Sequence, residues 1–366
     1  MSTLELQRPP IIPSSQTARE RSRLAPQALS ALAQSSLPYP LSLLFSSDAI
    51  SKYTSAETLF YSCLQTGDNA SAKQCLDALI ARFGADNERV MGLAGVYAEA
   101  TAADTKALEG QLEVYKAQVK EAPANMVIRK RGVALLKSMG RLPDAVQVLV
   151  TLVQDNPIDA ESWAELGELY VLQGLWGQAV YCFEEVLLGM PNAWNVSLPD
   201  AHASGRFAQL LITAQIHARL AEILYLSTQT TSTSSTPSDA TSLTTLTRAL
   251  KSSLRSIELC PAYLRAFYSL HLITTALLTY SLPTTRTSSS SAVARSSNST
   301  TSTDTTPDFP TPSQQTVQKL RELATAQLAE IVRRSSAGET GWTGYDDAEV
   351  AAAREVLSRE GAGVAR

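Results

Sequence analysis

The chain has 366 residues, of which 44% are hydrophobic and 18% are charged, and its 31 basic and 35 acidic residues give a formal net charge of −4. A weakly acidic chain without a basic patch lacks the electrostatic attraction that binding to nucleic acid or anionic lipid requires. The four cysteines are scattered and form no Cys-x-x-Cys pair, which favours buried free thiols in a reducing compartment.

The first segment, residues 1–48, is rich in proline and serine and is predicted to be mostly flexible, although the stretch LAPQALSALAQSSL has the composition of a short helix. It lacks the continuous apolar core of a secretory signal. No stretch of the chain reaches the roughly 20 apolar residues that span a bilayer. We therefore expect a cytosolic protein without a membrane span.

Residues 49–282 are predicted to form an array of helix pairs. The apolar residues recur with a helical period, and Pro123, Pro157 and Pro191 lie 34 residues apart, which is the period of the tetratricopeptide repeat. The clearest repeat has a repeat-defining core of Trp163, Leu166, Gly167, Tyr170, Ala179, Phe183 and Pro191. The sequence predicts an all-α tetratricopeptide-repeat solenoid of about five to six helix pairs, interrupted by disordered Ser/Thr-rich insertions.

Each residue type in this repeat has a physical reason. The tryptophan, leucine and tyrosine form one stripe on the first helix, and the glycine lets the second helix approach closely. The alanine and phenylalanine place a small and a large side chain one turn apart on the second helix, so that the helices interlock. Gly140 and Gly174 stand where the first helix must end and turn, and Pro191 ends the second helix.

Two segments are almost purely Ser, Thr, Pro and Asp: residues 227–242, predicted to be a disordered loop within the array, and residues 283–312, predicted to be a disordered linker. Residues 313–366 are predicted to form C-terminal capping helices and a tail. The first of these helices places six apolar residues on one face: Val317, Leu320, Leu323, Ala324, Leu328 and Ile331.

The sequence offers no constellation for catalysis. His202, His217 and His271 are far apart and have no cysteine or carboxylate at metal-ligand spacing. No glycine-rich phosphate loop, nucleophile elbow or kinase signature occurs. We therefore expect a protein that is not an enzyme, with no catalytic, cofactor-binding or metal-binding residues and no cofactor.

Arrays of this kind usually bind through polar residues on the first helix of each pair, which line the concave surface. The candidate protein-binding face consists of Lys130, Arg131, Glu161, Glu165 and Glu168. The alternative interpretation is a solvated charged surface whose ion pairs contribute under about 1 kcal/mol each. Both interpretations remain open from the residues alone.

Residues 56–280 resemble subunit 2 of the endoplasmic reticulum membrane protein complex, in a fungal form. The resemblance rests on RVMGLAGVYAEA, RKRGVALLKSMGRLPDAV, AESWAELGELYVLQGLWGQAVYCFEEVLLGMP and LRAFYSLHLI. Because the Ser/Thr/Pro insertions and the proline-rich amino terminus depart from that family, nothing functional is transferred to them.

The resemblance implies a non-catalytic scaffold at the cytosolic face of the endoplasmic reticulum. Its partners would be the cytosolic portions of the other subunits, which would hold it peripherally at the membrane, with no nucleic acid bound. The complex would insert tail-anchored and multispanning membrane proteins. The alternative is a free tetratricopeptide adaptor or co-chaperone that binds short peptide segments.

Overall fold

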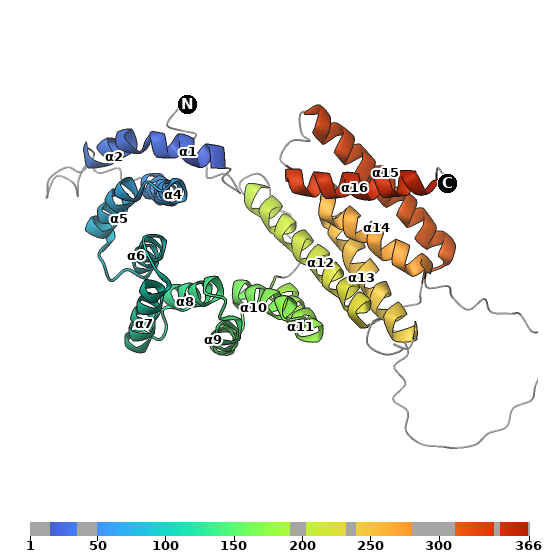
Figure 1. Cartoon of the computed structure of the whole chain (residues 1–366), viewed down its shortest axis with the longest axis horizontal. Helices are drawn as coiled ribbons and strands as arrows, with labels where there is room; N and C mark the ends of the chain where they lie inside the picture. Colours follow the sequence, from blue (N-terminus) through green and yellow to red (C-terminus); the bar gives the residue numbers. More distant parts are fainter. Residues whose placement is uncertain are drawn as a thin grey trace, which may run out of the picture. The chain divides into compact units, whose positions relative to one another are not determined.

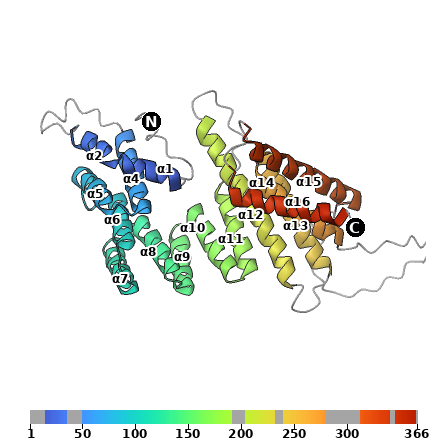
Figure 2. The same cartoon turned by 45° about the horizontal axis from the view of Figure 1, so that its top comes forward.

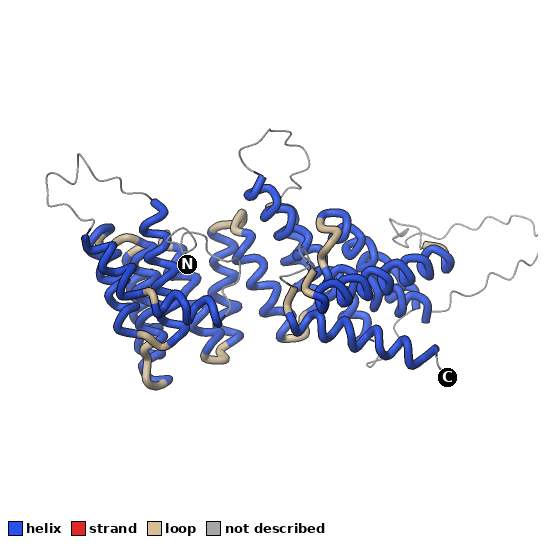
Figure 3. The backbone as a smooth tube through the Cα atoms, turned by 90° about the horizontal axis from the view of Figure 1, so that it is seen from above, coloured by secondary structure: helices blue, strands red, loops and turns tan. Residues whose placement is uncertain are grey.

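The computed structural model describes residues 15–34, 50–190, 203–231, 239–279, 312–339 and 345–364 (Figure 1). Within these ranges the protein contains fifteen helices and no strand (Figure 3). The chain divides into two compact units, residues 1–155 and residues 156–366. The prediction of an all-α fold built from tetratricopeptide helix pairs is confirmed, and the predicted array is shared between the two units.

The described residues of the first unit form three helix pairs and two preceding helices. The helices are α1 (Ser15–Arg23), α2 (Ala25–Gln34), α4 (Ile50–Thr66), α5 (Asn69–Phe83), α6 (Glu88–Ala100), α7 (Thr105–Glu121), α8 (Met126–Ser138) and α9 (Leu142–Asp155). The pairs are α4 with α5, α6 with α7 and α8 with α9, and α6 also packs on α8. Because each pair has little buried surface of its own, stacking between neighbouring pairs provides the core.

Helix α2 lies in the stretch that has the composition of a short helix, whereas α1 was not anticipated by the prediction that residues 1–48 are mostly flexible. Helix α1 packs along α4, and α2 contacts both α4 and α5. Ala18 and Ala25 are 1% and 0% exposed. Alanines let α1 and α2 approach α4 closely, a tertiary effect that the polar composition of α1 conceals. Residues 1–14 and 35–49 lie outside the described residues.

In the second unit the described ranges also form three helix pairs, followed by one further helix. Its helices are α10 (Ala160–Leu172), α11 (Trp176–Gly189), α12 (Ala203–Thr231), α13 (Asp239–Leu259), α14 (Leu264–Thr279), α15 (Gln314–Ala337) and α16 (Asp347–Val364). The pairs are α10 with α11, α12 with α13 and α14 with α15, and α16 packs on α15 and α14 (Figure 2). The described residues therefore hold six helix pairs in all, in agreement with the predicted count.

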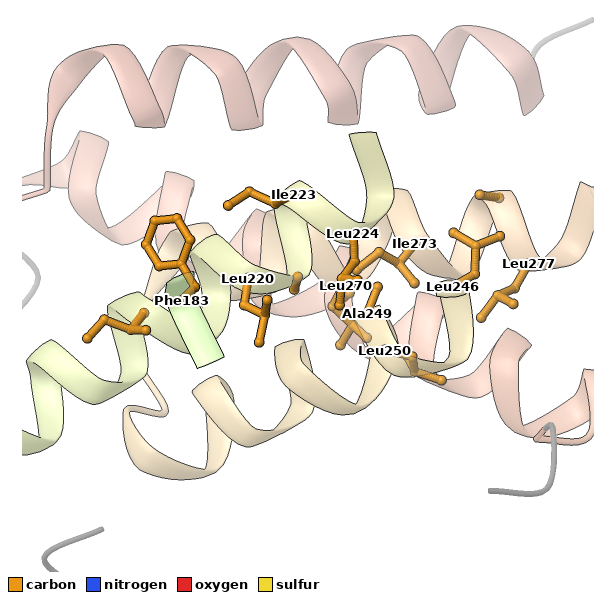
Figure 4. Close-up of a cluster of buried hydrophobic side chains, with 14 of the residues drawn as sticks. Phe183, Leu220, Ile223, Leu224, Leu246, Ala249, Leu250, Leu270, Ile273 and Leu277 are labelled. Atoms are coloured by element: carbon orange, nitrogen blue, oxygen red, sulfur yellow. The ribbon is translucent and has the colours of Figure 1, made fainter. Parts of the chain in front are cut away.

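The core of the second unit joins five of its helices. Helices α11 to α15 contribute the buried apolar residues of one cluster, and Figure 4 labels ten of them: Phe183, Leu220, Ile223, Leu224, Leu246, Ala249, Leu250, Leu270, Ile273 and Leu277. A smaller cluster joins α14, α15 and α16 through Leu264, Phe267, Leu328, Ile331, Val350 and Ala353. These side chains cover the apolar face of α15.

The clearest repeat is built as the sequence predicts at its centre. Leu166, Ala179 and Phe183 are at most 3% exposed. A Cβ atom added to Gly167 would lie 2.8 Å from the Phe183 ring, so the close approach of α10 and α11 needs glycine there. Tyr170 is partly buried, and Pro191 lies outside the described residues.

Trp163, at the outer part of the same stripe, is only partly buried. Its indole Nε1–H donates a hydrogen bond to the Pro157 carbonyl oxygen at 2.9 Å. Its ring stands edge-on to Tyr181, with 6.0 Å between the ring centroids. Trp163 therefore ties the turn before α10 to α11 and belongs to the rim of the core.

The predicted turns are confirmed at both glycines. Gly140 and Gly174 have φ values of +75° and +72°, a left-handed conformation that glycine adopts without a steric penalty. After α10, the Leu175 N–H donates to the Tyr170 carbonyl oxygen at 2.9 Å, and after α8 the Arg141 N–H donates to the Leu136 carbonyl oxygen at 2.9 Å. These six-to-one bonds close both helices in the same way.

The predicted loop 227–242 is helical at both ends, because α12 continues to Thr231 and α13 begins at Asp239. The Ser227 and Thr228 hydroxyls donate to the Leu224 and Tyr225 carbonyl oxygens at 2.7 and 2.6 Å. Such back-bonding satisfies hydroxyl groups inside a helix, so composition alone sets the loop boundaries too wide. Residues 232–238 lie outside the described residues.

Helix α15 requires one further correction. Val317, Ala324, Leu328 and Ile331 are buried as predicted and Leu320 is partly buried, whereas Leu323 is 48% exposed. Leu323 precedes Ala324, and neighbouring residues on a helix point about 100° apart. Of the predicted linker 283–312, only Pro312 lies within the described residues.

We expect the Gly167→Ala substitution to lower the free energy of unfolding by about 1–3 kcal/mol, because the new methyl group would press on the buried Phe183 ring. The matched control is Gly177→Ala in α11, where an added Cβ has no neighbour within 4 Å. The control should keep or raise stability because alanine favours the helix. Urea unfolding followed by circular dichroism measures both, and equal stability of the two variants would contradict the packing described for Gly167.

Paired charges on the first helices as the candidate functional site

The first helices of the first unit are joined by ion pairs between successive repeats. Glu57 on α4 accepts two hydrogen bonds from Arg89 on α6, at 3.1 and 2.6 Å. Glu99 on α6 pairs in the same way with Arg131 on α8. In both pairs the two residues are 32 positions apart, so each glutamate reaches one repeat ahead.

The pair between Glu99 and Arg131 is the more buried of the two. The Tyr115 hydroxyl of α7 donates to Glu99 Oε1 at 2.5 Å, which brings a third helix to the site. Burial alone would lower the pKa of Arg131, but the Glu99 carboxylate outweighs it and raises that pKa. Burial, together with the hydrogen bond to Glu99, raises the pKa of Tyr115. Arg131 therefore stays charged and Tyr115 stays a neutral donor.

The second unit repeats the pattern over three first helices and the last helix. Arg219 on α12 donates to both carboxylate oxygens of Glu168 on α10, each at 2.7 Å. Arg219 also pairs with Glu222 one turn later, at 2.8 Å. Arg265 on α14 forms an ion pair with Glu222 at 3.3 Å, and Arg265 lies 3.8 Å from Glu349 on α16. One connected row of charges thus links α10, α12, α14 and α16.

Burial and hydrogen bonding make Arg219 the centre of this row. Its hydrogen bonds to Glu168, and then to Glu222, raise its pKa above the usual value although burial opposes the charge. At the far end, burial raises the pKa of the Glu349 carboxyl group. A two-pronged contact between guanidinium and carboxylate fixes both distance and orientation. These pairs therefore set how each first helix lies on the next within its unit.

The residues of the predicted protein-binding face fall into two sets. Lys130 and Arg131 lie on α8 in the first unit, and the three glutamates lie on α10 in the second. Arg131 and Glu168 are members of the ion pairs between repeats. Glu161 is exposed, whereas Lys130 and Glu165 are partly buried. Contact of any of these residues with a partner stays a prediction.

The residues that complete the pairs were missed from the sequence. They are Glu57, Arg89, Glu99, Arg219, Glu222, Arg265 and Glu349. One signal could have found the first two pairs, because a spacing of 32 is close to the repeat period of 34. Glu168 and Arg219 are 51 positions apart, so the longer connection between their repeats hides the same relation.

Three of the cysteines are buried thiols with raised pKa values. Burial raises the pKa of Cys63 to about 11 and of Cys75 and Cys182 to about 12, which keeps these thiols protonated and poorly nucleophilic. The described ranges contain no group of three or more His, Cys, Asp or Glu side chains placed to hold a metal ion. No helix in those ranges has both the length and the apolar character to cross a membrane.

The histidines lie in different surroundings. His271 is 4% exposed, and its Nδ1 atom lies 3.3 Å from the Thr325 hydroxyl. His217 on α12 has a buried Nδ1 atom without a hydrogen-bond partner. Burial, and then the charge of Arg255, lower the pKa of His217 to about 4. His202 lies outside the described residues.

The pKa of His217 makes stability depend on pH. The unfolded chain protonates it near pH 6.5 and the folded chain only near pH 4, so the free energy of unfolding should fall as the pH drops from 6.5 towards 4. One proton limits the slope to about 1.4 kcal/mol per pH unit. We expect His217→Phe to be less sensitive in this interval and at least as stable at pH 7. Chemical unfolding across this pH range tests it, and an unchanged slope in the variant would refute the assignment.

We expect Arg219→Gln to lower the free energy of unfolding by about 1–2 kcal/mol, because it removes the charged partner of Glu168 and leaves Glu222 with Arg265 alone. The matched control is Arg359→Gln, which removes an exposed pair with Glu355 on α16 and should cost under about 0.5 kcal/mol. The deficit of Arg219→Gln should persist in 0.5 M salt, since partly buried pairs are poorly screened. Equal effects of the two variants would show that the row of charges adds no more than surface pairs do.

The chain is similar in sequence to several known proteins. Residues 91–217 match the family model described as the EMC2 TPR-like repeat domain. The TPR repeat protein oca3 of Schizosaccharomyces pombe is 28% identical over 214 residues, which cover 58% of this chain and 63% of that protein. ER membrane protein complex subunit 2 of Dictyostelium discoideum is 32% identical over 139 residues, covering 38% and 42%.

The subunit 2 protein of Xenopus tropicalis is 30% identical over 136 residues, covering 37% of this chain and 44% of that protein. The chain thus spans less than two thirds of the length of each of these curated relatives. Among solved structures, the C-terminal part of a TPR repeat-containing protein from Cytophaga hutchinsonii aligns with a TM-score of 0.38 at 14% identity, covering 72% of this chain and 87% of that chain. Residues 91–217 are thus similar to the EMC2 TPR-like repeat domain, and the chain resembles the subunit 2 proteins of the ER membrane protein complex, as its sequence motifs predict.

Proposed function

We propose that the protein is a non-catalytic scaffold subunit of an ER membrane protein complex. It would lie at the cytosolic face of the endoplasmic reticulum and be held there by the cytosolic portions of membrane-embedded partners. In that position it would support the insertion of tail-anchored and multispanning membrane proteins. The observation that carries the proposal is the match of residues 91–217 to the EMC2 repeat domain, together with relatives named as subunit 2 of the complex.

The physical character of the helix pairs supports a scaffold role. A scaffold must present its contact residues in fixed positions, and the charged pairs between first helices hold neighbouring repeats in register within each unit. A preorganised surface loses little conformational entropy when a partner binds. The array can therefore orient several partner segments without supplying any chemistry of its own.

The candidate contacts for such partners are three polar residues of the predicted face, on one first helix of each unit. Lys130 on α8 and Glu161 and Glu165 on α10 are the residues we assign to partner binding. Replacing Glu168 with lysine would place a second positive charge against Arg219. A loss of binding in that variant would not distinguish disturbed folding from a lost partner contact. A test of the interface should therefore leave Glu168 unchanged.

We expect the tagged full-length chain, purified from detergent-solubilised membranes, to retain a fixed set of membrane-embedded subunits that mass spectrometry identifies. Glu161→Lys combined with Glu165→Lys should reduce their recovery at unchanged helicity, because like charges repel any basic segment held there. The control is Glu355→Lys on α16, which should leave recovery unchanged. Recovery of soluble proteins alone would refute the scaffold role and favour the adaptor.

A further inference from the structure

The last turn of α15 contains a serine that follows two arginines. Arg333, Arg334 and Ser335 lead into Ser336, so arginines stand three and two positions before this serine. The dipeptide Arg-Arg occurs at no other place in the sequence. Protein kinases that prefer basic substrates select serines by arginines at such positions, because a guanidinium pairs with the carboxylates of the kinase cleft in a fixed geometry. The spacing therefore predicts a phosphorylation site for a kinase of this class.

The structure leaves this serine accessible at the end of its helix. Ser336 is exposed, and so is Ala337, the last residue of α15. Gly338 then adopts the left-handed conformation, with a φ of +65°. A kinase cleft holds its substrate in an extended form, so the last turn of α15 must unwind. None of residues 333–336 is buried, and helix ends open at little cost when no buried side chain is lost.

A third arginine contacts the same hydroxyl group from α16. Arg354 Nη2 donates a hydrogen bond to Ser336 Oγ at 2.9 Å, and the Ser336 hydroxyl donates in turn to the Val332 carbonyl oxygen at 2.6 Å. Arg354 is exposed, so this bond to an uncharged acceptor contributes little as it stands. A guanidinium that already contacts the serine oxygen is within reach of a phosphate on that oxygen, which it can bind through two donors.

The other charges at this helix end decide whether a phosphate is tolerated there. Glu330 pairs with Arg333 at 3.1 Å and with Arg334 at 2.5 Å. Glu339 lies 3.4 Å from Arg333 and 3.8 Å from Arg334. A phosphate adds negative charge at the carboxyl end of a helix and near Glu339, where negative charge is disfavoured. The two arginines of α15 and the arginine of α16 offset this repulsion.

We propose that Ser336 is phosphorylated by an arginine-directed protein kinase and that Arg354 then binds the phosphate and fastens α16 to α15. ATP supplies the phosphoryl group. The bond between Ser336 Oγ and the γ-phosphorus forms as the bond between that phosphorus and the bridging oxygen breaks. ADP leaves with the electron pair, and the hydroxyl proton passes to the catalytic carboxylate of the kinase. This site does not depend on the proposed scaffold function.

The contact between α15 and α16 is where the phosphate would act. Val350 and Ala353 of α16 are buried against Leu328 and Ile331 of α15. Ala353 directly precedes Arg354 in the sequence, so the phosphate would lie next to this cluster. Because α16 attaches through a small apolar cluster, one charge-assisted hydrogen bond beside it is a substantial addition to the contact. Phosphorylation should therefore make α16 open less often.

The first experiment incubates the full-length chain with ATP and the catalytic subunit of an arginine-directed serine kinase, and mass spectrometry locates the phosphate. We expect phosphate on Ser336, both in the parent and in Ser335→Ala. Arg333→Gln combined with Arg334→Gln should lower the initial rate on the order of tenfold, because the kinase loses both guanidinium contacts. The control Arg359→Gln removes a charge outside the motif and should leave the rate unchanged. No phosphate on Ser336, or an unchanged rate in the double variant, would overturn the proposal.

The second experiment compares amide hydrogen exchange in α16 before and after phosphorylation of the full-length chain. Phosphate on Ser336 should slow exchange in α16 by roughly three- to tenfold. Arg354→Gln should accept the phosphate at the same rate but show no such slowing, since the partner on α16 is missing. Circular dichroism checks that each variant is folded. Unchanged or faster exchange in the phosphorylated parent, or equal slowing in Arg354→Gln, would refute the role of Arg354.

Discussion

A glutamate on one first helix paired with an arginine on the next is the contact on which the order of these repeats depends. Apolar packing holds each helix pair together but tolerates small rotations and slips between neighbouring pairs. A two-pronged ion pair does not tolerate them, because removing one partner leaves a partly buried charge unpaired. Glu99 with Arg131, and Glu168 with Arg219, therefore convert approximate stacking into a defined register.

The same pairs limit how the protein can bind partners. Arg131 and Glu168 look like binding residues in sequence because they are polar and lie on first helices. A partner that used either one would have to replace its internal contact, and the exchange would gain little free energy. Binding energy is more readily available from residues that take no part in these two pairs.

Sequence reasoning succeeded where one residue type satisfies a local requirement. Gly174 had to turn the chain, and Ala179 and Phe183 had to interlock with α10, so pattern alone located them. It failed where the answer depends on a distant segment. Helix α1 packs on α4 with Ala18 buried. The exposure of Leu323 depends on where α14 and α16 lie, and Arg219 pairs with Glu168 across 51 residues. The local periodicity of the sequence contains no information about these long-range contacts.

The two spacings of the ion pairs have a consequence for how such a chain can change. Glu57 and Arg89 are 32 positions apart and Glu168 and Arg219 are 51 apart, yet both pairs join successive first helices. The two residues of each pair are in contact in space, whereas the number of residues between them differs from pair to pair. Extra residues can therefore be added to the connections without altering the match between repeats, because lengthening a flexible loop adds little closure entropy. In such an architecture, low-complexity insertions have little effect on stability. Natural variation in length should therefore be found in the connections, while the facing sides of the first helices stay the same.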